Sequence, residues 1–172
     1  IMYNRISIIG GSGSRKSTLA TILSNKFGLP AIHLDSINFN SNWKEINKNT
    51  RDNIILEKSN EDKWIIDGNY LNTLPYRFDR ADLIIWLDYS TFAQLQGIFK
   101  RLYTLFGKEK PEVPGCKERF NLKFLKYVIT YNKKKRPEIL KLLNNVPKDK
   151  VLIFKSRKDL NKWLKKGGNY DS

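Results

Sequence analysis

The 172-residue sequence has one cysteine, one histidine and one methionine. The single cysteine, Cys116, excludes an internal disulfide. No apolar run reaches the roughly 18 residues of a membrane-spanning helix, and we find no secretory signal. Helix-turn-helix, zinc-finger and aromatic RNA-binding signatures are also missing, which argues against sequence-specific recognition of nucleic acid. These absences predict a cytoplasmic protein with no membrane partner.

Acidic residues are scarce in the second half of the chain. Residues 1–96 hold 11 Lys/Arg and 10 Asp/Glu, whereas residues 97–172 hold 21 and 7, within a formal net charge of +15. Such a basic half attracts phosphates. It fits a nucleotide, non-specific contact with DNA, or a solvated surface without a ligand, and charge alone leaves these readings open.

Length and composition predict one domain, residues 1–172, because 40% hydrophobic residues suffice for a single core. Apolar runs predict strands at residues 5–9, 31–34, 63–66, 82–87 and 151–154. Helical spacing marks residues 17–23, 50–60, 91–106, 121–131, 137–143 and 159–166. Their alternation predicts a three-layer α/β fold with a five-stranded parallel sheet.

Two polar stretches interrupt this alternation. Residues 36–49 are rich in asparagine and predict a loop. A charged stretch with two prolines begins at residue 107, and we expect a small helical lid inserted around residues 107–120.

The stretch "GGSGSRKST" follows the first predicted strand and opens the first helix. It resembles the phosphate-binding P-loop pattern G-x-x-x-x-G-K-[ST], except that Arg15 stands at the second glycine. Lys16 is predicted to be a catalytic residue that contacts the phosphates, and Ser17 is predicted to bind Mg²⁺. The alternative to a phosphate-binding site is an ordinary glycine-rich turn. The residues predicted to bind ATP here are Gly10, Gly11, Ser12, Gly13, Ser14, Arg15, Lys16, Ser17 and Thr18.

Arg15 is expected to strain this turn without removing it. A left-handed arginine costs about 1–2 kcal/mol, so the predicted outcome is a working anion site with weaker nucleotide affinity than an Arg15→Gly variant.

Two aspartates end neighbouring predicted strands and open onto the same edge of the sheet. Asp67, in "WIIDGNY", is predicted to bind the metal, the alternative being a turn residue. Asp35, in "AIHLD", is predicted to bind the acceptor hydroxyl or act as a base, the alternative being a helix cap. We expect His33, the lone histidine, to be packed or hydrogen-bonded rather than catalytic.

Arginines can stabilise the charge of a transferring phosphoryl group. Arg77, Arg101 and Arg119 are the predicted catalytic arginines because each lies beside the proposed site or lid, and Arg157 is predicted to bind the nucleotide. Arg80 and Arg136 are weaker candidates, and surface charge is the alternative for all six.

The ordered segments "IIGGSGSRKSTLA", "LPAIHLD", "WIIDGNY", "RADLIIWLD", "PGCKERFNLKFLKYV" and "KSRKDLNKWL" resemble bacterial P-loop proteins labelled DNA topology modulation proteins, which are relatives of adenylate kinase. The resemblance covers nearly the whole chain. It implies a nucleoside-kinase-like fold with the lid after the fourth strand, and it places the metal-linked carboxylate on Asp67. Asn69 and Tyr70 stand where adenylate kinases have a Pro-Arg pair, which argues against adenylate as acceptor.

The favoured function is therefore an ATP- and Mg²⁺-dependent phosphotransferase with an unidentified acceptor. The alternatives are a DNA-associated topology modulation protein whose nucleotide site is a switch, and a plain, slow NTPase. Nothing in the sequence indicates an oligomeric state.

Overall fold

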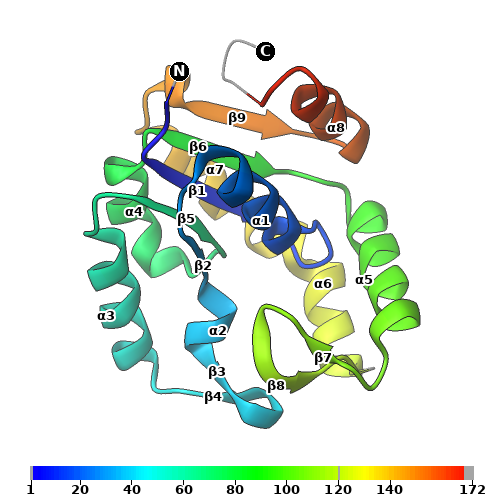
Figure 1. Ribbon diagram of the computed structural model, residues 1–172. Coiled ribbons are helices and arrows are strands. Elements are labelled where there is room, and N and C mark those ends of the chain that lie inside the picture. The colour runs from blue at the N-terminus through cyan, green and yellow to red at the C-terminus, as the bar shows by residue number, and fades with distance from the viewer. Residues whose placement is uncertain (1, 120, 169–172) are drawn as a thin grey trace.

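The computed structural model describes residues 2–119 and 121–168; residues 1, 120 and 169–172 of the predicted domain lie outside this part. Its centre is a parallel sheet in the order β2-β5-β1-β6-β9 (Figure 1). The strands are β1 (Arg5–Gly10), β2 (Ala31–His33), β5 (Trp64–Asp67), β6 (Leu83–Leu87) and β9 (Val151–Phe154). This parallel order confirms the predicted five-stranded α/β fold, and the central strands β1, β5 and β6 are buried from both sides.

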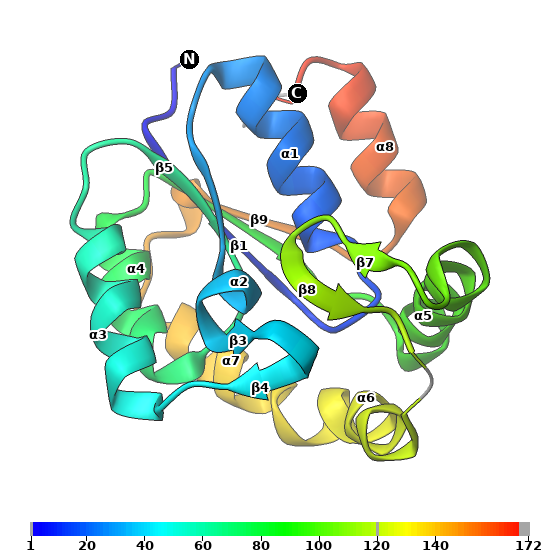
Figure 2. The ribbon, with the colours of Figure 1, turned by 60° about the horizontal axis from the view of Figure 1, so that its bottom comes forward.

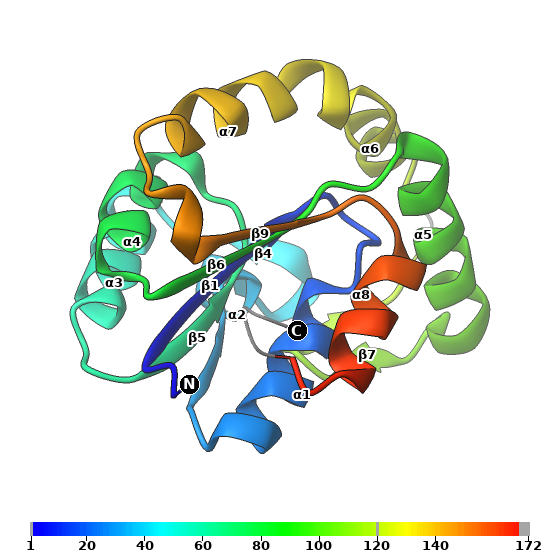
Figure 3. The ribbon, with the colours of Figure 1, turned by 90° about the horizontal axis from the view of Figure 1, so that it is seen from above.

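Helices cover both faces of the sheet (Figure 3). Ile6 and Ile8 of β1 point to the layer of α1 and α8, and Ile9 points to the layer of α3, α4 and α7. In the described ranges no helix is long and apolar enough to cross a bilayer. The longer helices are α1 (Lys16–Phe27), α3 (Lys48–Ser59), α4 (Leu74–Arg80), α5 (Thr91–Leu105), α6 (Leu122–Lys134), α7 (Arg136–Leu143) and α8 (Arg157–Lys165).

The predicted loop at residues 36–49 is wrong. It contains the end of α2 (Leu34–Asn38), then β3 (Phe39–Asn40), the 3-10 turn η1 (Ser41–Trp43) and β4 (Lys44–Glu45). We call residues 39–45 the arm. Its strands of two residues each are too short to show periodicity, and a polar turn joins them. The sequence did not predict α4, because one of its three buried positions is Arg77, which interrupts the apolar spacing of a helix.

The predicted helical lid is wrong in its secondary structure. Residues 107–118 contain an antiparallel hairpin of β7 (Glu109–Lys110) and β8 (Val113–Lys117). Two prolines and a left-handed Gly115 oppose helix here, while Val113 and Cys116 are buried. Figure 2 shows this hairpin between the arm and α5, beside the edge at which the parallel strands end.

Candidate functional site

The turn between β1 and α1 folds back on the carbonyl of Gly11. Ser14 donates to this oxygen from its backbone N–H at 3.3 Å and from its Oγ at 2.5 Å. Lys16 Nζ donates to the same oxygen at 3.1 Å. Burial lowers the pKa of Lys16, partly offset by Asp35 and Asp67. The lysine therefore lies within electrostatic reach of both predicted site carboxylates.

Arg15 has the left-handed conformation, with φ 67° and ψ 39°. Its side chain is exposed, so the strain lies in the backbone while the guanidinium faces solvent. The α1 helix that follows has no side-chain cap and no acidic residue in its first turn. Its first N–H groups are therefore open to an anion, and the helix dipole favours negative charge there.

Asp67 ends β5, which lies between β1 and β2. Ser17 Oγ donates to Asp67 Oδ1 at 3.1 Å, and His33 Nδ1 hydrogen-bonds Asp67 Oδ2. This hydrogen bond raises the pKa of His33, and the expectation that His33 is hydrogen-bonded is confirmed. Mg²⁺ usually keeps several water and phosphate ligands, so a hydroxyl beside one carboxylate fits that ion.

Asp35 lies in α2, directly after β2. The Tyr70 hydroxyl donates to Asp35 Oδ1 at 2.7 Å. Burial and the Asp35 charge raise the pKa of Tyr70, which keeps the phenol protonated as a donor. The Arg51 guanidinium lies 4.7 Å from the centre of the Tyr70 ring. These contacts fix the Asp35 side chain, and the place of Asp35 just after β2 puts it at the same strand edge as Lys16.

Asn69 and Arg77 brace the backbone around this site. Asn69 Oδ1 accepts from Gly10 N–H at 3.0 Å, and its Nδ2 donates to Gly10 O and Tyr131 Oη, both at 2.8 Å. Arg77 is fully buried and donates to Gly68 O at 3.0 Å through both Nη atoms, and to Asn69 O. The Arg77 guanidinium thus hydrogen-bonds backbone carbonyl groups and positions the backbone after β5, a role that the sequence did not predict.

The other predicted arginines do not converge on one point. Arg157 Nη2 donates to Gly13 O at 2.6 Å and to Ala93 O at 3.2 Å. The Arg157 side chain therefore supports the backbone of the phosphate-binding turn. Arg101 Nε lies 3.0 Å from Glu118 Oε2 in an ion pair. Arg119 is exposed and lines a small hollow between α5 and α6.

Sequence reasoning missed Lys110 on the hairpin. Burial and then Arg101 lower the pKa of Lys110, partly offset by Asp35 among other carboxylates. Lys110 also acts to lower the pKa of Lys16, so the two ammonium groups lie within electrostatic reach of each other. No signal could have singled it out, because Lys108, Lys110 and Lys117 look alike in a charged stretch.

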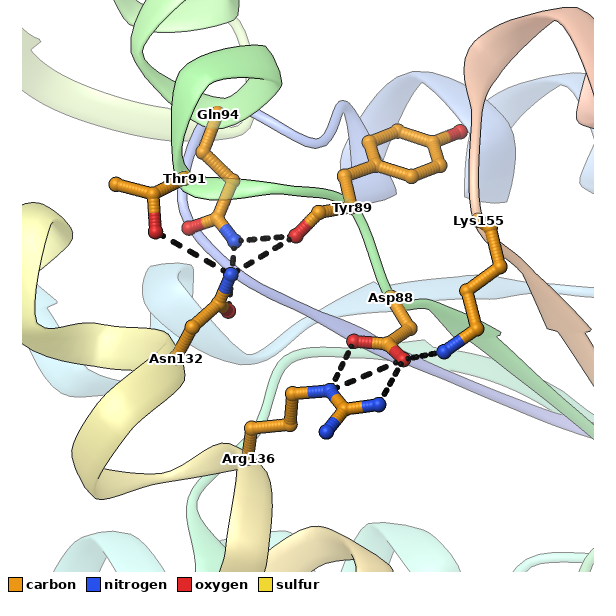
Figure 4. A network of polar contacts seen from close by, with 7 residues as sticks. All are labelled: Asp88, Tyr89, Thr91, Gln94, Asn132, Arg136 and Lys155. Atoms are coloured by element: carbon orange, nitrogen blue, oxygen red, sulfur yellow. Dashed lines mark hydrogen bonds and ion pairs between the residues drawn. The ribbon is translucent and has the colours of Figure 1, made fainter.

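Glycines let α5 pack directly on the phosphate-binding turn. A Cβ at Gly97 would lie 2.0 Å from Gly13 O, and one at Gly13 would lie 2.2 Å from Gln94 O. Gln94 Nε2 donates to Tyr89 O and Asn132 Oδ1, each at 3.0 Å (Figure 4). The turn, α5 and α6 therefore share one buried contact.

Asp88 joins three further segments beside that contact (Figure 4). Arg136 Nε and Nη2 donate to its two carboxylate oxygens at 2.9 and 3.0 Å, and Lys155 Nζ donates at 2.5 Å. Burial acts to raise the pKa of Asp88, but these hydrogen bonds outweigh it and hold the pKa below the usual value. Asp88 thereby links β6 to α7 and to the end of β9.

The comparisons with known proteins agree with this geometry at the level of fold. The chain shares its fold with shikimate kinase. The enzyme from Bacteroides thetaiotaomicron matches with TM-score 0.59 at 15% identity, over 95% of this chain and 96% of that one. Shikimate kinase from Acinetobacter baumannii, solved with shikimate, matches with TM-score 0.55 at 15% identity, over 96% of each chain.

A gluconokinase from Sinorhizobium meliloti matches with TM-score 0.53 at 12% identity, over 94% of this chain and 87% of that one. Neither a family model nor a curated protein matches the sequence. The fold is therefore that of small-molecule kinases such as shikimate kinase and gluconokinase, and function has to be argued from the site.

Some of the basic residues in the second half of the chain lie on α6. The side chains of Lys123, Lys126, Lys133 and Lys134 are exposed there. Contact between this surface and DNA stays a prediction.

Proposed function

We propose that the protein is an ATP- and Mg²⁺-dependent kinase that phosphorylates a hydroxyl group of a small molecule or nucleotide. One observation carries the proposal: Lys16, the open N-terminus of α1 and the Ser17–Asp67 pair gather at one strand edge, within electrostatic reach of Asp35. Lys16, the open helix N-terminus and the Ser17–Asp67 pair are the features of a site for a triphosphate and a metal ion. Asp35 supplies a base beside that site.

The reaction assigns a role to each side chain. The acceptor oxygen forms a bond to the γ-phosphorus while the bond to the ADP oxygen breaks, and the hydroxyl proton passes to Asp35. Tyr70 occupies Asp35 Oδ1, and among the described residues no hydrogen bond reaches Oδ2, which is the oxygen we assign to the proton.

Cations in this site oppose the charge of the phosphates. Ser17 would hold Mg²⁺ through its hydroxyl and Asp67 would hold it through water, and the bound ion would neutralise phosphate charge. Lys16 contacts the β- and γ-phosphates. Lys110 adds a second ammonium group from the hairpin, a role that we had expected of Arg101 and Arg119.

Formation of ADP, measured with Mg²⁺ and either ATP or GTP against a panel of hydroxyl-bearing metabolites and nucleotides, tests the proposal. At least one acceptor should raise turnover above the acceptor-free rate. Lys16→Ala should lower that turnover about 100-fold or more, because it removes a cation aimed at the transferring group.

Lys26→Ala is the matched control, since Lys26 lies at the other end of α1 with an exposed side chain. It should keep the wild-type rate. If no acceptor exceeds the background rate, the kinase proposal fails and acceptor-independent hydrolysis is what remains. Equal losses in the two variants would assign the effect to helix stability instead.

A further inference from the structure

We propose that Trp43 ties the arm to the hairpin, so that the acceptor side and the nucleotide side of the site close as one unit. Trp43 is thereby a positioning residue that acts through Lys110. The inference rests on the proposed function for its catalytic consequence, but the physical link can be tested without any substrate.

Contacts from both chain segments meet at Trp43. Its Nε1 donates to Lys117 O at 2.9 Å, and its backbone N–H donates to Cys116 Sγ at 3.4 Å. The Cys116 thiol in turn donates to Asn40 O at 3.2 Å. Lys110 Nζ lies 5.4 Å from the centre of the Trp43 ring, over its face. Main-chain, thiol and ring contacts therefore all join the arm to the hairpin.

The arm is bent unfavourably in order to make these contacts. Trp43 has φ 60°, a left-handed region that a bulky residue rarely adopts, and Asn42 before it has φ 59°, which asparagine tolerates better. On the hairpin side, Gly115 approaches the arm so closely that a Cβ there would lie 2.7 Å from Ser41 Oγ. A left-handed tryptophan persists only where surrounding contacts fix it, which favours a specific link over a chance contact.

The two linked segments lead to different halves of the site. The arm continues directly from α2, which carries Asp35. The hairpin carries Lys110 and continues from α5, whose Gly97 packs against the turn at Gly13. An acceptor seated at Asp35 holds the arm, and through Trp43 it holds Lys110 over the phosphates. The link thus favours transfer to the acceptor over hydrolysis in an open site.

Cys116 reports directly on this link, because it is the only cysteine, is fully buried and lies between the two segments. Its alkylation by iodoacetamide, without ligand, should be slow in the wild-type protein. Trp43→Ala should raise the rate about tenfold or more by allowing local opening. Trp43→Phe, which keeps a ring but loses the Nε1 donor, should fall between them.

Tyr103→Ala is the matched control, since Tyr103 is an aromatic residue of α5 with 92% exposure. It should match the wild-type rate. Melting curves separate local opening from loss of the whole fold: supporting results show faster alkylation at an unchanged melting temperature. Equal rates in wild type and Trp43→Ala, or rates that only follow the melting temperature, overturn the proposal; Trp43→Phe carries the test if Trp43→Ala does not fold.

Acrylamide quenching extends the test to the nucleotide. Trp64, Trp86 and Trp163 are at most 4% exposed, so quenching reports mainly on Trp43. A non-hydrolysable ATP analogue with Mg²⁺ should reduce quenching in the wild type and not in Lys110→Ala. Unchanged quenching with nucleotide bound, seen by a fluorescent analogue, counts against coupled closure. Absence of nucleotide binding counts against the proposed function and leaves the alkylation result standing.

Discussion

Arg15 shows how one residue can break a sequence pattern while the local shape persists. The pattern requires glycine because its backbone is left-handed there, and Arg15 adopts that conformation with its side chain exposed. The conformation followed from spacing alone. The contacts that hold the preceding part of the turn at Gly13 were not predictable, because they come from Gln94, Gly97 and Arg157, which are distant in the chain.

We expect the free turn to relieve its strain by leaving the left-handed conformation, whereas bound phosphate holds it there. Replacing Arg15 by glycine should therefore tighten nucleotide binding about 5- to 30-fold, which corresponds to about 1–2 kcal/mol of strain. A fluorescent nucleotide titration measures this. Arg15→Ala is the control, because it removes the charge and keeps the Cβ. If the alanine variant binds as tightly as the glycine variant, charge and not strain is responsible; wild-type binding equal to that of the glycine variant contradicts the prediction.

The predicted site residues that belong to a sequence motif lie together in the structure, whereas the arginines that were chosen by residue type do not. Lys16, Ser17, Asp67 and Asp35 lie together because each stands at, or a few residues after, the carboxyl end of a strand of one parallel sheet. Arginines were chosen only by their nearness in sequence to the site or lid, and side chains this long can turn to many partners. Their actual directions depend on α4, on the hairpin and on α8, whose packing no local pattern encodes.

At the scale of elements, the segment after β5 connects the phosphate-binding turn to α6. Asn69 pairs with both backbone groups of Gly10 and also reaches Tyr131. Long buried strands were predictable from continuous apolar runs. The arm and the hairpin were not, because their short strands lie in polar or proline-bearing sequence, and α4 was not, because the buried Arg77 interrupts its apolar spacing.

Asn69→Ala should weaken nucleotide binding about tenfold and lower the free energy of unfolding by about 1–3 kcal/mol, because Gly10 loses two hydrogen bonds at a buried site. Nucleotide titration and denaturant melts provide the two readouts. Tyr131→Phe removes only the bond to α6 and should affect binding less than threefold. Equal effects of both variants would mean that Asn69 supports nucleotide binding through its contact with α6 and not through Gly10 in the turn.

At the scale of the whole molecule, a group of charged side chains joins the central sheet to the helix layer that contains α7. Asp88 leaves the end of β6 and binds Arg136 at the start of α7 and Lys155 after β9 (Figure 4). The three-layer order was predictable from the alternation of strands and helices. This cross-link was not, because its three members are spread over 68 residues of sequence.

Asp88→Asn should lower the free energy of unfolding by about 1–3 kcal/mol at pH 7 through lost charged hydrogen bonds. The folded protein holds the pKa of Asp88 below its usual value, so this stabilisation is present above about pH 4 and is lost as the pH falls further. Thermal melts from pH 3 to 7 should therefore show the two proteins converging in acid. Exposed Asp149→Asn is the control, and a gap that stays constant with pH contradicts the assignment.

The close approach of Gly97 to Gly13 also gives α5 a mechanical role. The helix touches the phosphate-binding turn near its start and carries the hairpin beyond its end at Leu105. Eight residues separate Gly97 from Leu105, about 12 Å of helix at 1.5 Å per residue, so a pivot of about 10° at the contact moves the far end by about 2 Å. Any rotation of α5 about the glycine contact would therefore displace the hairpin that carries Lys110.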